Sequence, residues 1–362
     1  MTGRTAISAF AATLAIAATP AAALAQEAPV EPVVDPTAAA AAQRAADPQA
    51  RTSPTARAEP TERAVVKQRG GRLGVGFVSG VYHVGSATLT VPGRVVRISG
   101  RINPYVPHQK VRVRIWLGDR LAKSVVVTPK PTKTKRTATF SAKFTAGRIG
   151  DVKVFAVHER TPEQKAIQSA AAKVTVANPN AGLGTTSPFA GLINQKLLAL
   201  GYATSFGNTF DAATGRALEA FRKVNGMDRT QTLDATIVDK LLRGVGGFKV
   251  RYPQHGRHVE AHLGQQVLAL IENGKVFRAY TTSSGKPSTP TVLGNYRFYW
   301  RQPGVNNKGM VDSTYFIRGY AIHGYPDVPT YPASHGCLRV PIPVARDIYN
   351  WVHIGDQIDV YY

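Results

Sequence analysis

Apolar and polar residues alternate with a period of two in the first globular part of the chain. The clearest run is VRVRIWL at residues 111–117. This alternation predicts a strand with one buried face. Similar short runs, separated by glycine, proline and charged turns, lie at 84–90, 94–99, 124–128, 137–144, 152–157 and 172–177. Seven short strands within residues 64–180 predict an antiparallel β-sandwich.

The hydrophobic period changes to that of a helix in residues 183–245. Gly201 is placed to end the first helix, and Asp211 and Asp234 are predicted N-caps of two more. The apolar residues that define the three helical faces are Ile193, Leu197 and Leu200, then Ala217, Leu218, Phe221 and Val224, then Val238, Leu241 and Leu242. Three short helices predict a small bundle with a limited core.

Residues 247–362 return to β-like patterns. Asn273-Gly274 is the strongest short hairpin signal in the chain. The predicted elements are strands at 266–272, 275–282, 294–300 and 320–322, a helix at 343–352 and a last strand at 357–361. The chain is therefore expected to be multidomain and mainly β. A loosely immunoglobulin-like sandwich comes first, a three-helix module follows, and a mostly β domain closes the chain.

The first 63 residues are predicted to contain an export signal and a linker. Arg4, an apolar run at 6–18 and Ala23-Leu24-Ala25 are typical of a secretory signal peptide cleaved after residue 25. An uncleaved anchor is the alternative. No later stretch has about twenty apolar residues, so no further membrane segment is predicted. Residues 26–63 are rich in Ala and Pro and almost lack aromatic residues, which predicts a flexible linker.

Charge and cysteine content narrow the possible functions. The chain has 45 Lys and Arg against 22 Asp and Glu, a formal net charge of +23. Residues 64–180 hold 21 basic and 4 acidic residues, so 21 minus 4 leaves +17 in this block. For an exported protein this favours an anionic cell-wall polymer over nucleic acid as the partner, with a solvated basic spacer as the alternative. A single cysteine excludes an intrachain disulfide and a cysteine-rich zinc site.

The one cysteine, Cys337, lies in the polar sequence SHGCLR rather than in an apolar stretch. Gly336 permits close backbone approach, and His335 and Arg339 supply positive potential that is expected to favour a thiolate. His323 lies fourteen residues upstream, and a loop of that length can return it to the thiol. A cysteine nucleophile needs such a base, whereas a structural thiol with surface histidines, the alternative, does not require this clustering.

This pattern resembles the signature of the L,D-transpeptidase catalytic domain, the YkuD-like family. The residues that carry it are His323-Gly324 and Ser334–Arg339. The resemblance extends over residues 247–362 and includes Ser283-Ser284-Gly285-Lys286 and Thr289-Pro290, although Val292 and Leu293 replace the frequent Pro and Thr. It implies a mostly β domain that acts on peptidoglycan tetrapeptide stems, needs no metal or cofactor, and is acylated by carbapenems.

The resemblance also implies roles for individual residues. Cys337 attacks the carbonyl before the terminal D-Ala, and the amine of a second stem takes the acyl group to form a 3→3 cross-link. Water as acceptor gives L,D-carboxypeptidase activity. His323 is the base and Gly324 O orients its ring, while backbone N–H groups of His335, Gly336 and Cys337 are candidates for the oxyanion hole. His335 is expected to shape the turn rather than to act as the base.

Substrate contacts are less sharply defined by the sequence. Arg339 is a candidate partner for a stem carboxylate, or a brace of its own loop. Ser334 is expected to hydrogen-bond within the loop rather than to act as a nucleophile. Tyr325, Tyr331 and Tyr315 are candidate pocket walls, with ordinary aromatic packing as the alternative for each.

The helical module resembles the peptidoglycan-binding domain 1 family. The residues that carry the resemblance are Leu197-Leu198, Leu200-Gly201-Tyr202, Phe210, Thr214, the 217–221 helix and Asn225-Gly226-Met227. This copy departs from the family pattern at Phe221-Arg222 and Gly207-Asn208. The resemblance implies binding to peptidoglycan stems, and a structural brace is the alternative.

Two other functions compete with the enzymatic one. A sortase-type transpeptidase also uses His, Cys and Arg in this order, but it lacks the compact His-Gly and Ser-His-Gly-Cys arrangement. A non-catalytic wall-binding or scaffolding protein would keep the fold without needing Cys337 and His323. The sequence therefore favours an exported enzyme that remains associated with the cell wall.

Overall fold

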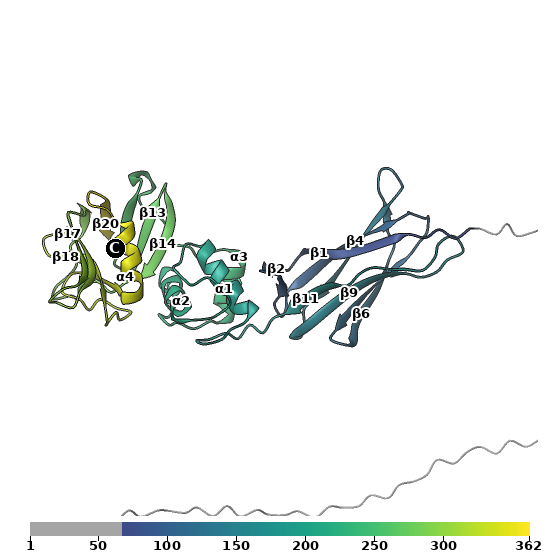
Figure 1. Ribbon diagram of the computed structural model, residues 1–362, viewed down its shortest axis with the longest axis horizontal. Helices are drawn as coiled ribbons and strands as arrows, with labels where there is room; N and C mark the ends of the chain where they lie inside the picture. Colours follow the sequence, from purple (N-terminus) through teal and green to yellow (C-terminus); the bar gives the residue numbers. More distant parts are fainter. Residues whose placement is uncertain (1–66) are drawn as a thin grey trace, which may run out of the picture. The chain divides into compact units, whose positions relative to one another are not determined.

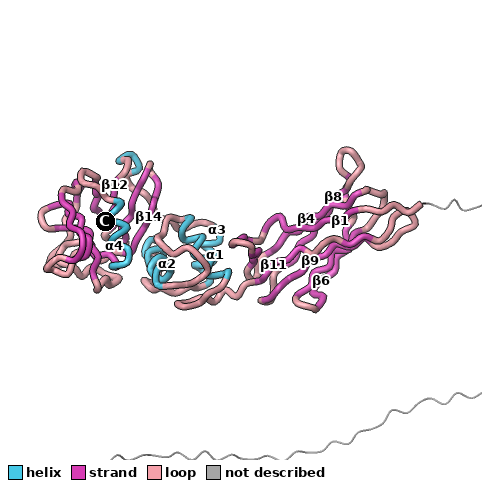
Figure 2. Tube along the Cα trace, viewed as in Figure 1, coloured by secondary structure: helices cyan, strands magenta, loops and turns pink. Residues whose placement is uncertain are grey.

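A computed structural model describes residues 67–362 (Figures 1 and 2). The predicted signal peptide, 1–25, and the predicted linker, 26–63, lie outside these residues, so both remain predictions. Across the described part of the chain, no helix is long and apolar enough to cross a membrane.

Two sheets form the basic region. The first has the order β1-β4-β8-β7, with strands at Arg72–Ser79, Val95–Asn103, Ala138–Thr145 and Lys130–Pro131. The second has the order β2-β3-β11-β9-β5-β6, with strands at Tyr82–Val84, Ala87–Thr90, Ala172–Val176, Gly150–His158, Val111–Leu117 and Arg120–Val127, and β10 at Ile167–Gln168 pairs with β9. Alternate residues of both sheets, among them Ile98, Val113 and Val154, are buried in one shared core.

The structure confirms the seven predicted strands and corrects two expectations about this region. The strand β1 was not predicted, because Gly74 and Gly76 interrupt the apolar alternation that marks a strand. The arrangement is also not purely antiparallel, because β11 pairs with β3 in the parallel sense, Thr175 opposite Leu89.

The three predicted helices are present as α1 (Pro188–Ala199), α2 (Ala212–Val224) and α3 (Ala235–Arg243). Asp211 accepts a hydrogen bond from the Thr214 amide at 2.9 Å, and Asp234 accepts one from the Ile237 amide at 2.9 Å. Both aspartates are therefore the N-caps that the sequence predicted. Gly201 follows α1 with φ +86°, a conformation that ends the helix at little steric cost.

Two further sheets form the C-terminal region. The larger has the order β14-β13-β12-β20-β15, with strands at Lys275–Thr281, Val267–Glu272, His258–His262, Gln357–Tyr361 and Gly294–Arg297. The smaller has the order β16-β17-β18-β19, with strands at Trp300–Val305, Val311–Ile317, Tyr320–Tyr325 and Leu338–Pro341. Helix α4 (Ile342–Trp351) closes the region, and the side chains of both sheets and of α4 share one core.

The hairpin predicted at Asn273-Gly274 joins β13 to β14, and both residues have positive φ, 50° and 70°. The single strand predicted at 294–300 is wrong. The chain leaves the larger sheet after β15 and enters the smaller sheet at Trp300, and Phe298 is buried between the two strands. The strand β18 also continues beyond the predicted end and includes His323 and Gly324.

The strand β13 is buried on both faces. Val267, Ala269 and Ile271 pack in one cluster with apolar residues of α1, α2 and α3. Leu268 and Leu270, which point the opposite way, pack in the core of the C-terminal sheets. The helices therefore do not close a core of their own, as the small-bundle prediction assumed. They cover one face of the larger C-terminal sheet.

The chain after α1 also covers the edge of the same sheet. The Ala279 amide donates to Gly201 O at 2.7 Å, and the Ala203 amide donates to Ala279 O at 3.1 Å. Both bonds involve β14, the edge strand of the larger sheet. An unpaired strand edge invites association with other chains, so this pairing protects it.

These contacts predict that residues 247–362 do not form a well-behaved protein alone. Removing the helices exposes Val267, Ala269 and Ile271, at a cost of roughly 1.5–3 kcal/mol for each large apolar side chain. We expect residues 181–362 to be monomeric with a cooperative melt, and 247–362 to aggregate or to melt far lower. Size-exclusion chromatography and thermal melts measure this. A monomeric 247–362 with an unchanged Tm would contradict the prediction.

Candidate active site

Two adjacent parallel strands bring the predicted nucleophile and base together. β18 and β19 pair with His323 opposite Arg339 and with Ile322 opposite Leu338. Ile322 and Leu338 point into the core. Since successive side chains of a strand point to opposite faces, His323, Cys337 and Arg339 lie together on the other face. The register of β18 and β19 therefore puts His323 on the same face as Cys337. The sequence alone predicts only that the fourteen-residue loop between them permits this.

Cys337 is half-buried, and its thiol is placed to donate to Gly319 O, with the sulfur 3.7 Å from that oxygen. Burial raises the pKa of this thiol. The Ala321 amide and the charges of Lys308 and Arg339 lower it, but they do not overcome burial. The charge of Arg339 favours the thiolate, as expected, but burial outweighs it and leaves the pKa of the thiol above its ordinary value. The sulfur carries its proton at neutral pH.

His323 is buried, and its Nδ1 lies 3.0 Å from Gly324 O. Because a carbonyl only accepts, Nδ1 carries the hydrogen and the Nε2 lone pair is left available. Burial is the main cause that lowers the pKa of His323 to about 4. The charge of Arg339 lowers it too, while the hydrogen bond to Gly324 raises it. His323 is thus a neutral base at pH 7, and the bond from the ring to Gly324 O that the sequence implied is present.

Ser334 and Gly336 build the turn that presents the thiol. Ser334 Oγ accepts from the Gly336 amide at 3.0 Å and donates to Cys337 O at 2.6 Å. Gly336 has φ +113°, and a Cβ at this position would lie 1.9 Å from a ring carbon of Tyr320. Ser334 is therefore a loop hydrogen-bonder, as predicted. The Gly336 amide is already engaged, so it leaves His335 and Cys337 as the candidate oxyanion donors.

The Ser-Ser-Gly-Lys segment upstream holds this turn from the other side. The Ser334 amide donates to Ser284 O at 2.9 Å, and Ser283 exchanges two backbone hydrogen bonds with Arg339, at 2.9 and 3.0 Å. Buried Thr291 donates from Oγ1 to Gly336 O at 2.8 Å and accepts from the Gly285 amide at 2.9 Å. Sequence reasoning missed Thr291, which follows Ser288, Thr289 and Pro290 and carries no distinct signal of its own.

Arg339 braces the loop that follows β18. Its guanidinium lies 4.2 Å from the centroid of the Tyr325 ring, and Nη1 lies 3.5 Å from Asp327 Oδ2. The Tyr325 ring in turn meets the His323 ring edge-on at 5.7 Å. Tyr325 therefore forms one wall beside the base.

The other predicted site residues lie further out. Tyr331 is exposed, and its carbonyl accepts from Ser283 Oγ at 2.7 Å. His335 is also exposed, with Nε2 3.4 Å from Lys286 Nζ. This position agrees with the expectation that His335 shapes the turn and is not the base.

The helical module reaches the same loop through Arg229, which sequence reasoning missed. One guanidinium nitrogen donates to Thr330 O, and the other donates to Gly264 O at 3.1 Å. Thr330 belongs to the loop between β18 and the nucleophile turn. Arg229 thus ties that loop to the helices.

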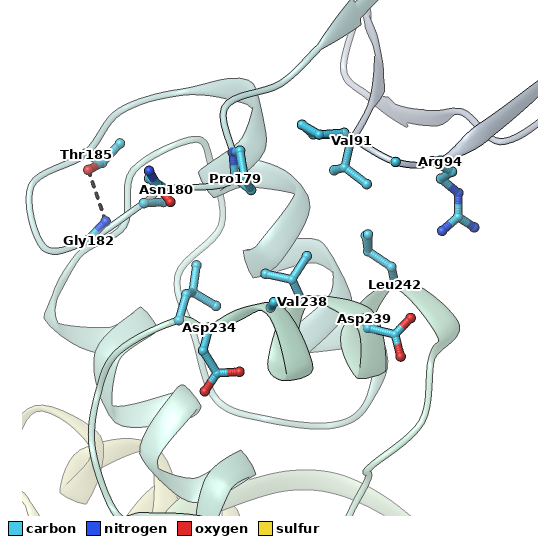
Figure 3. A pocket seen from close by; sticks show the side chains of 15 residues that line it. Val91, Arg94, Pro179, Asn180, Gly182, Thr185, Asp234, Val238, Asp239 and Leu242 are labelled. Atoms are coloured by element: carbon cyan, nitrogen blue, oxygen red, sulfur yellow. Dashed lines mark hydrogen bonds between the residues drawn. The ribbon is translucent and has the colours of Figure 1, made fainter. Parts of the chain in front are cut away.

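A well-formed cavity of the described residues lies elsewhere. It has a volume of about 800 Å³, and Figure 3 shows Val91 and Arg94 facing Val238, Asp239 and Leu242 of α3 across it. Cys337 and His323 do not line it. In residues 67–362, no group of three or more His, Cys, Asp or Glu side chains is placed to hold a metal ion.

Comparison with known proteins agrees with this geometry. Residues 256–360 match the YkuD family, the L,D-transpeptidase catalytic domain. The match contains both Cys337 and His323. A comparison with curated proteins found no match.

Three similar solved structures are L,D-transpeptidases. An L,D-transpeptidase from Xylanimonas cellulosilytica is 29% identical, with 51% of this chain and 98% of that chain covered and a TM-score of 0.48. One from Stackebrandtia nassauensis is 19% identical, with coverage of 51% and 98% and a TM-score of 0.33. L,D-transpeptidase 1 of Mycobacterium tuberculosis is 20% identical, with coverage of 30% and 62% and a TM-score of 0.25.

The protonation states predict how the thiol responds to pH. A resting thiolate–imidazolium pair would react with iodoacetamide at a nearly constant rate from pH 4 to 7. With a protonated thiol and a neutral His323, we expect the rate to rise about tenfold per pH unit through the acid and neutral range and to level off only above the ordinary thiol pKa of about 8.5. Intact-mass spectrometry reports Cys337 alone, because it is the only cysteine. A plateau in the acid range would overturn this assignment.

Proposed function

We propose that this protein is an L,D-transpeptidase that acts on peptidoglycan tetrapeptide stems through an acyl-enzyme on Cys337. The observation that carries the proposal is the pairing of β18 and β19. This pairing supports a position of the sole thiol on the same face as His323, whose Nδ1 lies 3.0 Å from Gly324 O. The match of residues 256–360 to the YkuD family supports the substrate class.

In the proposed first step, His323 Nε2 takes the thiol proton while Cys337 Sγ attacks the carbonyl between the third stem residue and the terminal D-Ala. The amides of His335 and Cys337 donate to the oxyanion. His323 then returns the proton to the leaving amine, D-Ala departs, and a thioester remains on Cys337.

In the second step, the side-chain amine of another stem's third residue attacks the thioester. His323 takes a proton from that amine and returns it to the sulfur as the thioester breaks. The product is a 3→3 cross-link. When water is the acceptor, the same steps give a shortened stem and L,D-carboxypeptidase activity.

The resting protonation states favour transfer of the thiol proton to His323 in the same step as the attack of the sulfur on the carbonyl. Burial raises the pKa of Cys337 and lowers that of His323, so a free ion pair is disfavoured before the substrate binds. The proton therefore moves as the sulfur attacks, which is the regime of general-base catalysis. A non-catalytic scaffold would have no use for this arrangement, and a sortase-type reaction lacks support from the family match.

We also propose that the protein is exported and that its basic region binds an anionic wall polymer. The two sheets of that region, which we propose to be immunoglobulin-like, place like charges directly opposite each other, Arg97 with Lys143 and Lys153 with Lys173. Such pairs destabilise a sheet, so a bare spacer would gain nothing from them. The signal-like sequence of residues 1–25 supports export.

For the helical module, we propose binding to peptidoglycan stems in addition to the bracing of the catalytic sheet. The resemblance of residues 183–245 to peptidoglycan-binding domain 1 supports the binding role. The packing of α2 on β14 and β13 supports the brace.

The enzymatic proposal predicts a graded set of variants. With a disaccharide tetrapeptide as substrate, Cys337→Ala is expected to abolish D-Ala release and 3→3 dimers. His323→Ala should lower the rate by about 10²–10⁴, the usual contribution of a general base. His335→Ala, the matched histidine control, should retain turnover.

Mass spectrometry of the products measures these rates, and a carbapenem adduct on Cys337 reports acylation directly. Near-wild-type turnover by His323→Ala, together with a dead His335→Ala, would refute the assignment of the base. Wild-type protein that makes neither product while its thiol still reacts would favour the scaffold.

The wall-binding proposal predicts salt-sensitive association. Residues 67–362 should sediment with purified cell wall at low salt and dissociate by about 0.5 M NaCl, where charges are screened within a few ångströms. The double change Arg97→Gln and Lys143→Gln should weaken binding while leaving Tm unchanged or higher, because it removes a like-charge pair. Sedimentation that does not depend on salt would contradict this proposal. So would a fragment of residues 181–362 that sediments as fully as residues 67–362.

A further inference from the structure

A row of side chains crosses the smaller sheet from the nucleophile to the opposite edge. Trp300 of β16 pairs with Tyr315 of β17, and Tyr315 pairs with Ala321 of β18. Ala321 lies beside Cys337, because the next residue, Ile322, pairs with Leu338. Directly paired residues have side chains on the same face, so Cys337 and the two aromatic rings share one surface.

The two aromatic rings are stacked on each other on that surface, and we call the pair the Trp300–Tyr315 platform. Tyr315 is 7% exposed and packs with Met310, Ala321 and Cys337 in one apolar cluster. The Trp300 ring stacks on Tyr315, with centroids 4.4 Å apart and an interplanar angle of 20°. Trp300 is nevertheless 47% exposed, so much of its indole meets solvent.

Amide side chains border the platform. Tyr315 OH donates to Gln302 Oε1 at 3.1 Å, and Asn306 Nδ2 donates to the same oxygen at 3.1 Å. Asn306 Oδ1 in turn accepts from the amides of Lys308 and Met310, both at 3.0 Å. The turn after β16 is thus fixed against the platform. A flat apolar surface with fixed amides at its rim suits a ligand that has both a C–H face and polar groups at its edge.

The spacing agrees with the substrate of the proposed reaction. Cys337 and Trp300 are three strand spacings apart, about 14 Å at 4.7–4.9 Å each. Three extended residues of a stem span about 10 Å, which is the distance from the attacked carbonyl back to the start of the peptide. A stem that crosses the strands with its third carbonyl at Cys337 therefore ends about 4 Å, or one strand spacing, before Trp300, and the attached sugar comes next.

The topology leaves one direction for such a stem on this surface. β19 is one edge strand of the smaller sheet, and β16 is the other. Beyond β19 lies the Ser283 segment, which pairs with Arg339, so within the sheet itself the surface runs from Cys337 across β18 and β17 towards β16. The row is therefore the available track from the nucleophile along the sheet.

We propose that the Trp300–Tyr315 platform is a sugar-binding subsite, which stacks the pyranose ring that carries the donor stem. The inference rests on the proposed function for its substrate, and it adds a binding site that recognises the glycan rather than the peptide. The platform then makes the enzyme prefer stems that are attached to sugar over free stems.

The test compares two substrates with the full described chain, residues 67–362. Trp300→Ala should lower kcat/KM for the disaccharide tetrapeptide about tenfold, mainly through KM, and leave the free tetrapeptide unchanged. Trp300→Phe should restore part of the preference. The matched control is Phe277→Ala, which removes a 41% exposed aromatic ring from β14, on the other sheet, and should change neither substrate.

A binding measurement separates this inference from the proposed function. The experiment is saturation-transfer NMR of Cys337→Ala protein with the stem-free disaccharide, N-acetylglucosaminyl-N-acetylmuramic acid. We expect sugar signals from this protein, and we expect the further change Trp300→Ala to remove them. Sugar signals that persist after Trp300→Ala would overturn the proposed subsite. So would kinetics in which the wild type and Trp300→Ala each use the two substrates equally well. An inactive wild type that still shows Trp300-dependent sugar contact would refute the proposed function alone.

Discussion

The burial of β13 on both faces is the constraint on which the rest of the C-terminal structure depends. Val267 and Ile271 face the helices, while Leu268 and Leu270 face the catalytic core. A strand with two apolar faces must be covered on both sides, so the sheet behind the nucleophile exists only with α2 packed on it. The helical module is therefore part of the architecture of the C-terminal region.

The same alternation of faces organises the chemistry. In the smaller sheet, one set of alternate residues closes the core, and the other set is free to carry reactive groups. Burial near that core then sets the protonation of those groups, because removing water disfavours both the thiolate and the imidazolium. The site is thus neutral at rest. Under the proposed function, reactivity would come from the fixed position of His323 relative to Cys337 and not from a preformed ion pair.

Local signals in the sequence predicted local structure well. Asp211 and Asp234 cap helices, and Asn273-Gly274 turns a hairpin, because each depends on neighbours within four residues. The predictions failed where distant contacts decide the outcome. The aromatic run at 294–300 divides between two sheets, and the pKa of Cys337 follows burial that no sequence pattern reveals. The family match was nevertheless predictable from the sequence, because the residues that carry the resemblance lie in two short motifs.

A close-packed turn explains why the motif around the nucleophile is so restricted. Gly336 has no room for a side chain against Tyr320, and its carbonyl is held by the Thr291 hydroxyl. Ser334 satisfies the Gly336 amide and Cys337 O at once, so a larger or apolar residue would leave buried polar groups unpaired. Each position of the turn thus has a separate steric or hydrogen-bonding reason. The packing and hydrogen bonds of its neighbours hold the thiol in place. The aromatic row lies on the same sheet, so its position relative to the thiol is fixed as well.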